Sequence, residues 1–199
     1  MNAVIVFGTH YGSARDYAEK LAEQLRLECF PYKEFRPSRH YDLLLYVGSL
    51  YAGGVPGLAK TLARCAGAPP RRVLVVTVGI SDPADAQNAE NIANSVCRQL
   101  PAELRDKTEL FHVRGRLDYP RLKPHHRLMM KLVYQQAQKT PPEKRDEETR
   151  ALIATYNQTV DFVDFSALEP VIDRYRQLDT SGAFTDPAQG ATIGTEGGR

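Results

Sequence analysis

The stretch Ala3-Val4-Ile5-Val6-Phe7, followed by Thr9-His10-Tyr11-Gly12-Ser13-Ala14, decides the fold of this chain. The apolar run is typical of a buried strand, and helical spacing begins directly after the second stretch. A strand that ends in small and hydroxyl residues before a helix leaves backbone N–H groups free, with the positive end of the helix dipole behind them. We therefore predict a phosphate site here. The alternative is an ordinary turn in which Thr9 or Ser13 caps the helix and Gly12 adopts an unusual backbone angle.

The composition fits one globular domain with an added segment. The chain has 199 residues and a net charge of +2, which gives no reason to expect a nucleic-acid partner. The cysteines, Cys29, Cys65 and Cys97, are widely spaced, so we expect neither a disulfide framework nor a metal site. No signal sequence and no apolar run long enough to cross a bilayer are visible, which predicts a cytoplasmic protein. We expect a domain at 1–178 and a disordered tail at 179–199.

Apolar runs and helical spacing alternate along most of the chain. Two uninterrupted apolar runs, Asp42–Gly48 and Arg72–Val78, predict parallel strands covered on both faces, with the first at the sheet centre. Weaker strands are predicted at Glu28–Phe35, at a sheet edge because Pro31 lacks an N–H group, and at Glu109–Leu117. Helical spacing recurs at Tyr17–Leu27, Gly57–Cys65 and Asn88–Leu100. The predicted fold is α/β, a doubly wound parallel five-stranded sheet with helices on both faces.

Sheets of this kind bind ligands beyond the carboxyl ends of their strands, where the strand order reverses. Three predicted loops open on this edge and together make the candidate cofactor site. They comprise Thr9, His10, Tyr11, Gly12, Ser13 and Ala14; Ser49, Leu50, Tyr51, Ala52 and Gly53; and Gly79, Ile80, Ser81 and Asp82. His10 can add positive charge beside a phosphate, or it can simply be solvated. Ser81 or Asp82 can instead cap the next helix, and Tyr51 can be an ordinary loop residue.

The segment 118–159 is longer than an ordinary connection, so we interpret it as an insertion after the fifth strand. A helix is predicted at His125–Gln138, and a charged run follows at Glu143–Arg150. Phe162–Phe165 is predicted to complete the sheet region. Ser166–Glu169 is predicted to start a closing helix as a capping box.

The inserted helix combines basic and apolar side chains. This composition suits an amphipathic helix that rests on an anionic membrane or contacts an apolar molecule carrying carboxylates. The alternative is that its apolar side packs on the domain while its charges are solvated. The residues considered as substrate or membrane contacts are Arg121, Lys123, Arg127, Met130 and Lys131.

Two parts of the sequence resemble known families. Thr9 and Gly12 fit the Thr-x-x-Gly phosphate loop of the flavodoxin family. Gly115–Arg121 followed by Arg127–Leu132 is similar to the fifth strand and insertion of the menaquinone-dependent protoporphyrinogen dehydrogenases, a subgroup with the flavodoxin fold. The resemblance covers residues 1–178 and implies an FMN cofactor, a partner-facing insertion, and redox chemistry at flavin N5 rather than at a side-chain acid or base.

Two features depart from the flavodoxin pattern. Tyr11 and Ala14 stand where hydroxyl residues usually bind the phosphate, which leaves Thr9, Ser13 and backbone N–H groups for that task. The chain has no Trp, so the stacking role of an aromatic residue after the third strand falls to Tyr51. FMN affinity is therefore expected to be lower than the family pattern suggests.

The resemblance implies an FMN-dependent oxidoreductase that passes electrons from an organic donor to a quinone. One alternative is an electron carrier that docks redox partner proteins, although carriers usually present an acidic face and this insertion is basic. Another is a flavodoxin-like domain that has lost FMN. A lipid quinone would be met by contact of the basic insertion with the inner face of the membrane.

Overall fold

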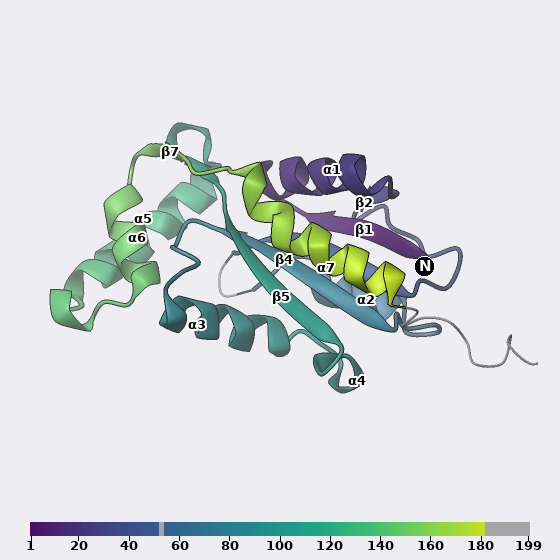
Figure 1. The fold of residues 1–199 in the computed structure, drawn as a ribbon. Coiled ribbons are helices and arrows are strands. Elements are labelled where there is room, and N and C mark those ends of the chain that lie inside the picture. The colour runs from purple at the N-terminus through teal and green to yellow at the C-terminus, as the bar shows by residue number, and fades with distance from the viewer. Residues whose placement is uncertain (52–53, 182–199) are drawn as a thin grey trace, which may run out of the picture.

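The five-stranded parallel sheet expected from the sequence is confirmed in the computed structural model, which describes residues 1–51 and 54–181 (Figure 1). The strands, in chain order, are β1 (Ala3–Gly8), β2 (Cys29–Pro31), β3 (Leu43–Ser49), β4 (Arg72–Gly79) and β5 (Thr108–Arg114). Their order in the sheet is β2-β1-β3-β4-β5, so β3 is central and β2 is an edge strand, as expected. β2 is shorter than the expected strand, because the chain turns after Pro31, whose C=O accepts hydrogen bonds from the N–H groups of Glu34 and Phe35.

The register of the sheet aligns the ends of its inner strands. Gly8 of β1 pairs with Gly48 of β3, and Ser49 of β3 pairs with Val78 of β4. The loops after β1, β3 and β4 therefore start at the same edge of the sheet. The strand order reverses between β1 and β3, which is where this architecture binds its ligands.

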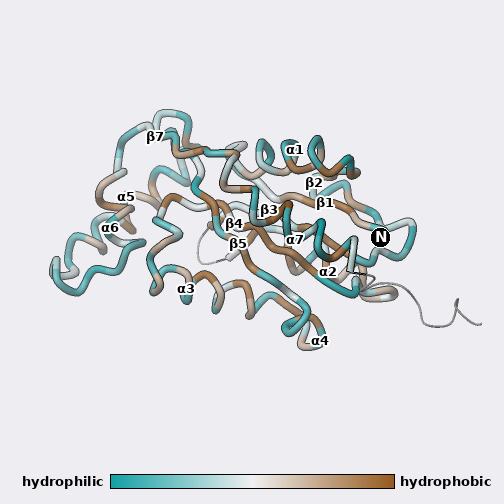
Figure 2. Tube along the Cα trace, viewed as in Figure 1, coloured by the Kyte–Doolittle hydropathy of each residue, from teal (hydrophilic) through white to brown (hydrophobic). Residues whose placement is uncertain are grey.

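Two helical layers cover the sheet, and each encloses its own apolar core. One layer consists of α1 (Ser13–Leu25) and α7 (Glu169–Thr180), and the other of α2 (Leu58–Arg64), α3 (Ala86–Cys97) and α4 (Ala102–Arg105). Ile5 belongs to the first core and Val4 to the second, because neighbouring strand residues point to opposite faces. Figure 2 shows hydrophobic residues concentrated in the central strands. Burial on both faces explains the uninterrupted apolar runs in the sequence.

The end of the sheet differs from the sequence prediction in two places. The fifth strand, predicted at Glu109–Leu117, is divided: β5 stays in the sheet, whereas β6 (Arg116–Asp118) turns away and pairs antiparallel with β7 (Thr159–Asp161). Phe162–Phe165 does not complete the sheet, since β7 pairs with β6 in a separate two-stranded sheet. The residue spacing that predicted one long strand continues through the turn, so spacing alone does not reveal the break.

The closing helix begins with a different cap from the predicted box at Ser166–Glu169. The Asp164 carboxylate accepts hydrogen bonds from the Ser166 N–H at 2.9 Å and from its O–H at 2.7 Å. This cap starts a 3-10 turn, η3 (Phe165–Leu168), which leads into α7. α7 continues to Thr180. Residues 182–199 of the predicted tail lie outside the described residues.

The insertion contains α5 (Pro124–Lys139) and α6 (Glu147–Thr155), with short 3-10 turns η1 (Tyr119–Arg121) and η2 (Pro142–Lys144). The helix predicted at His125–Gln138 is confirmed as α5. In Figure 1 the insertion lies beyond the carboxyl edge of the sheet, at the opposite end from the N-terminus. It is therefore placed on the side of the sheet where the candidate loops open.

Candidate functional site

The loop after β1 is a tight turn held by its own side chain. Thr9 Oγ1 accepts a hydrogen bond from the Gly12 N–H at 2.9 Å, and Gly12 takes a φ of 103°. α1 begins at Ser13 without a side-chain cap, so the N–H groups of its first turn have no partner within the helix. A Cβ atom at Gly12 would meet no atom within 4 Å, which indicates open space at this point. The loop therefore has the free donors and the room that an anion needs.

Ser13 faces the sheet rather than the open side of this turn. It is buried, and its hydroxyl accepts a hydrogen bond from the Arg116 N–H at 3.1 Å. The chain passes close by at Gly115, where a Cβ atom would lie 2.8 Å from Cγ1 of Val78 and 3.2 Å from Cβ of Ser13. Only glycine fits this crossing without a shift of its neighbours. Ser13 is therefore turned away from the anion that the turn could bind, whereas Thr9 would contact a phosphate through its own O–H.

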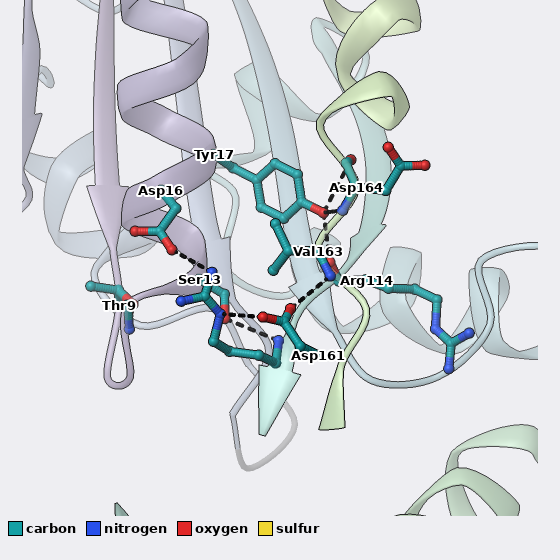
Figure 3. A network of polar contacts seen from close by, with 10 residues as sticks. Thr9, Ser13, Asp16, Tyr17, Arg114, Asp161, Val163 and Asp164 are labelled. Carbon is teal, nitrogen blue, oxygen red and sulfur yellow. Dashed lines mark hydrogen bonds and ion pairs between the residues drawn. The ribbon is translucent and has the colours of Figure 1, made fainter. Parts of the chain in front are cut away.

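A polar network fixes the start of α1 against the end of β5 (Figure 3). The Tyr17 hydroxyl donates to the C=O of Arg114 at 2.7 Å and accepts from the N–H of Asp164 at 2.9 Å. Burial raises the pKa of Tyr17, which keeps the phenol protonated as a donor. Arg116 also pairs with the carboxylate of Asp16 at 2.8 Å. The sequence did not reveal this network, because helical spacing identified Tyr17 only as an apolar position.

The loop after β3 begins next to the end of β1. Ser49 Oγ donates to the last carbonyl of β1 at 3.5 Å. Tyr51 and Gly54 exchange backbone hydrogen bonds of 2.9 and 3.0 Å, which close the loop at its base. Ala52 and Gly53, also predicted as site residues, lie outside the described residues. Ser49 and Tyr51 are thus brought to the Thr9–Ala14 loop, as the alignment of the strand ends requires.

Side chains from three segments meet at the phosphate loop. The ring centroid of Tyr51 lies 4.7 Å from that of His10 and 5.0 Å from that of His126, in α5. The Tyr11 hydroxyl hydrogen-bonds to Nδ1 of His126, and the Tyr51 hydroxyl donates to Sδ of Met129 at 3.6 Å. His126 and Met129 were not among the predicted site residues. Helical spacing in the insertion carries no signal that these two residues contact loops so distant in sequence.

The loop after β4 is in contact with both β5 and the loop after β3. The C=O of Gly79 accepts a hydrogen bond from the Gly115 N–H at 2.7 Å, and the C=O of Ile80 accepts one from Nε of Arg114 at 3.1 Å. A Cβ atom at Gly79 would lie 2.9 Å from Cδ1 of Leu50. The predicted convergence of the second and third loops is therefore present in the structure.

Ser81 and Asp82 do not cap α3, which was the alternative role considered for them. Asp85 is the cap, and its carboxylate accepts a hydrogen bond from the Asn88 N–H at 2.8 Å. Ser81 is buried, whereas Asp82 is exposed and accepts from the Ala84 N–H at 2.9 Å. Both residues lie at the start of the third loop, beside the candidate site.

His112 of β5 lies directly against the third loop. Its Nδ1 is 2.8 Å from Oγ1 of Thr77, while its Nε2 is buried with no hydrogen-bond partner among the described residues. A Cβ atom at Gly79 would lie 2.9 Å from Cε1 of this imidazole. Burial lowers the pKa of His112, which favours the neutral ring. An unused ring nitrogen beside the third loop was not expected from the sequence.

The insertion residues predicted as substrate or membrane contacts fall into separate groups. Lys123 lies at the phosphate loop, where its backbone N–H donates to the hydroxyl of Tyr11 at 3.4 Å. Arg127 and Lys131 line a different cavity within the insertion. Arg121 is exposed, and its Nε lies 3.3 Å from the carboxylate of Asp118 in β6. Met130 is half-buried. Of this set, Lys123 is the residue that the fold brings to the candidate cofactor site.

Cys29, Cys65 and Cys97 are free thiols. Burial raises the pKa of Cys29 to about 11 and also raises that of Cys65, so neither is a ready nucleophile. Within residues 1–51 and 54–181, no three His, Cys, Asp or Glu side chains are grouped to hold a metal ion. Over the same residues, no helix combines the length and the apolar character needed to cross a membrane.

The chain matches the model of a known domain family and has a weak likeness to a solved structure. Among solved structures it is similar to a candidate flavoprotein from Bacteroides eggerthii, with 13% sequence identity and a TM-score of 0.39, covering 57% of this chain and 87% of that one. No match is found among curated proteins. The family model for the Flavodoxin domain matches residues 4–144, and the chain therefore belongs to the flavodoxin domain family.

Proposed function

We propose that this chain is an FMN-dependent oxidoreductase. The observation that carries the proposal is the meeting of three strand-end loops at the switch point of the sheet, in a chain of the flavodoxin domain family. When bound, FMN supplies electron and hydride transfer at its isoalloxazine ring. The residues of this chain bind, orient and shield that group.

The described residues suit the parts of FMN in different ways. The Thr9–Ala14 loop suits the phosphate, because it combines uncapped N–H groups with open space at Gly12. Tyr51 places an aromatic ring beside this loop, and the third loop places backbone groups near it, both of which suit contact with the flavin ring. His112 adds a neutral imidazole with a nitrogen that has no partner in the described part of the chain. These features favour retention of the cofactor over a domain that has lost it.

A quinone acceptor and an organic donor similar to protoporphyrinogen belong to the same proposal. Leu128 and Leu132 lie one turn apart on α5 and are 60% and 58% exposed, with Lys131 between them in sequence. An exposed apolar stripe with neighbouring positive charge suits contact with an anionic membrane, where a lipid quinone is found. The chain would then act at the membrane surface without spanning it.

The test of the cofactor is its release from the purified protein. After denaturation, the flavin is separated by chromatography and identified by its mass and fluorescence. We expect FMN in an amount equimolar with the chain, either as purified or after incubation with FMN. FAD instead of FMN would contradict the assigned cofactor, and failure to bind any flavin would contradict the proposed function.

A turnover measurement separates the enzyme from a carrier. Protoporphyrinogen oxidation is followed by porphyrin fluorescence with a soluble quinone as acceptor. We expect turnover that depends on both FMN and quinone. An FMN-loaded protein that oxidises no donor but passes electrons to a redox partner protein would instead be a carrier.

A further inference from the structure

Basic side chains from three separate segments gather at the phosphate loop. His10 lies in the loop, Lys33 follows β2, and the start of α5 contributes Lys123, His125 and His126. The ring centroids of His10 and His126 are 5.6 Å apart, and those of His125 and His126 are 4.2 Å apart. Among the described residues, no carboxylate forms an ion pair with any of these side chains. The cluster therefore gathers basic groups that no carboxylate of the described residues neutralises.

Specific contacts hold the insertion in this position. The Tyr11 hydroxyl hydrogen-bonds to Nδ1 of His126 and accepts a second hydrogen bond, at 3.4 Å, from the backbone N–H of Lys123. His126 is only 7% exposed, although it lies on an otherwise largely exposed helix. Tyr11 thus fixes the first turn of α5 beside the loop that opens α1.

The positive charges in this cluster lower the pKa values of its histidines. Burial lowers the pKa of His126, and the positive charges of His125, His10 and Lys123 lower it further. Burial also lowers the pKa of His10, with Lys123 and Lys33 adding to the effect. A bound phosphate would reverse both trends, because a nearby negative charge favours the protonated imidazole. A bound anion would therefore offset the repulsion between the basic groups of this cluster.

We propose that Lys123 and His126 complete the phosphate site, contacting from the insertion side the same phosphate that the Thr9–Ala14 loop binds from the sheet side. The inference rests on the proposed function, since the phosphate is that of FMN. It makes the insertion part of the cofactor site and gives the chain its preference for a phosphorylated flavin. It also gives Tyr11 a role, because its phenol holds His126 beside the loop.

The experiment compares FMN with riboflavin, which has the same ring system but no phosphate. Dissociation constants are measured by flavin fluorescence quenching for the flavin-free wild-type chain and for Lys123→Met and His126→Asn. Asparagine keeps an amide near the position of Nδ1 and removes the charge. Lys139→Met is the matched control, because it removes the same charge from the far end of α5, where the side chain is exposed. Circular dichroism and thermal unfolding verify that each variant is folded.

We expect each substitution at the site to weaken FMN binding about tenfold or more, since hydrogen bonds to charged groups are stronger than neutral ones. Riboflavin binding should change by less than about twofold, and Lys139→Met should change neither affinity. Inorganic phosphate should compete with FMN but not with riboflavin. As an independent readout, FMN should slow amide hydrogen exchange in the first turns of α5, and riboflavin should not.

Different failures of this experiment have different meanings. Equal loss of FMN and riboflavin affinity, or no loss, in both site variants would overturn the role of the insertion while leaving the flavoprotein assignment intact. A wild-type chain that binds neither flavin would overturn the proposed function together with this inference. Wild-type binding of FMN and riboflavin with the same affinity would show that no phosphate site operates here.

Discussion

The two sides of the candidate phosphate site are held in place by different interactions. On the sheet side, the Thr9–Ala14 loop follows a fully buried strand, and the start of α1 is tied to β5 through Tyr17 and to β6 through Ser13. On the insertion side, the start of α5 is largely exposed and meets the loop through side-chain contacts such as that of His126. The sheet side is therefore part of the folding core, whereas the insertion can lose its contacts at little cost to the fold.

The largest expected loss of stability is on the sheet side, where the chain passes close to α1 at Gly115. Gly115→Val should destabilise the protein by about 3 kcal/mol, because a side chain there overlaps Val78 and Ser13 in a packed region. Urea-induced unfolding measures the change in free energy. Gly67→Val is the matched control, since a Cβ at Gly67 meets no atom within 4 Å. Equal effects of the two substitutions would show that the crossing is not tightly packed.

Removal of the hydrogen bonds of the Tyr17 hydroxyl should give the next largest loss of stability. Tyr17→Phe should cost about 2 kcal/mol, because it leaves the C=O of Arg114 and the N–H of Asp164 without their partner. Tyr175→Phe removes a hydroxyl that makes no hydrogen bond to the described residues and should cost less than about 0.5 kcal/mol. Thermal unfolding of the two variants compares them directly. A Tyr17→Phe protein as stable as the wild type would contradict the importance of this network.

The pH dependence of stability tests the buried imidazole on the sheet side. Because burial lowers the pKa of His112, the unfolded chain binds the proton more readily, and stability is lost as the pH falls below about 6.5. The loss is about 1.4 kcal/mol for each unit that separates the folded and unfolded pKa values. The lowered pKa values of His10 and His126 act in the same direction.

A substitution isolates the contribution of His112 to this pH dependence. His112→Asn should flatten the fall in unfolding free energy between pH 7.5 and 5.5, since asparagine does not titrate there. His40→Asn, at an exposed imidazole, is the matched control for the change of residue type. Identical profiles for all three proteins would show that His112 is not buried as a neutral ring.

The smallest effect on stability is expected on the insertion side. Leu132→Gln should change the unfolding free energy by less than about 0.5 kcal/mol, because the side chain is 58% exposed. The same change should reduce sedimentation of the protein with vesicles that contain anionic lipid, while neutral vesicles serve as the control. A large loss of stability would mean that the insertion belongs to the core after all, and unchanged sedimentation would argue against membrane contact.

Much of the sheet side was predictable because its signals are local. Apolar runs predicted β1, β3 and β4, and weaker patterns predicted β2 and the fifth strand. The position of Pro31 placed β2 at the edge. The strand break at Gly115 was missed, because what forbids a side chain there is contact with α1 and β4, which spacing does not record. The cap at Asp164 was missed for a similar reason, since Ser166–Glu169 offered an equally good local pattern.

The sequence by itself determined the α/β fold, the loops at the carboxyl edge of the sheet and the existence of a helical insertion. Periodicity and turn chemistry are properties of neighbouring residues, so one chain read in order is enough to find them. Only the tertiary structure decided that His126 and Lys123 lie at the Thr9–Ala14 loop and that His112 lies against the third loop. Those contacts join residues far apart in the chain, and they depend on packing that no local pattern encodes.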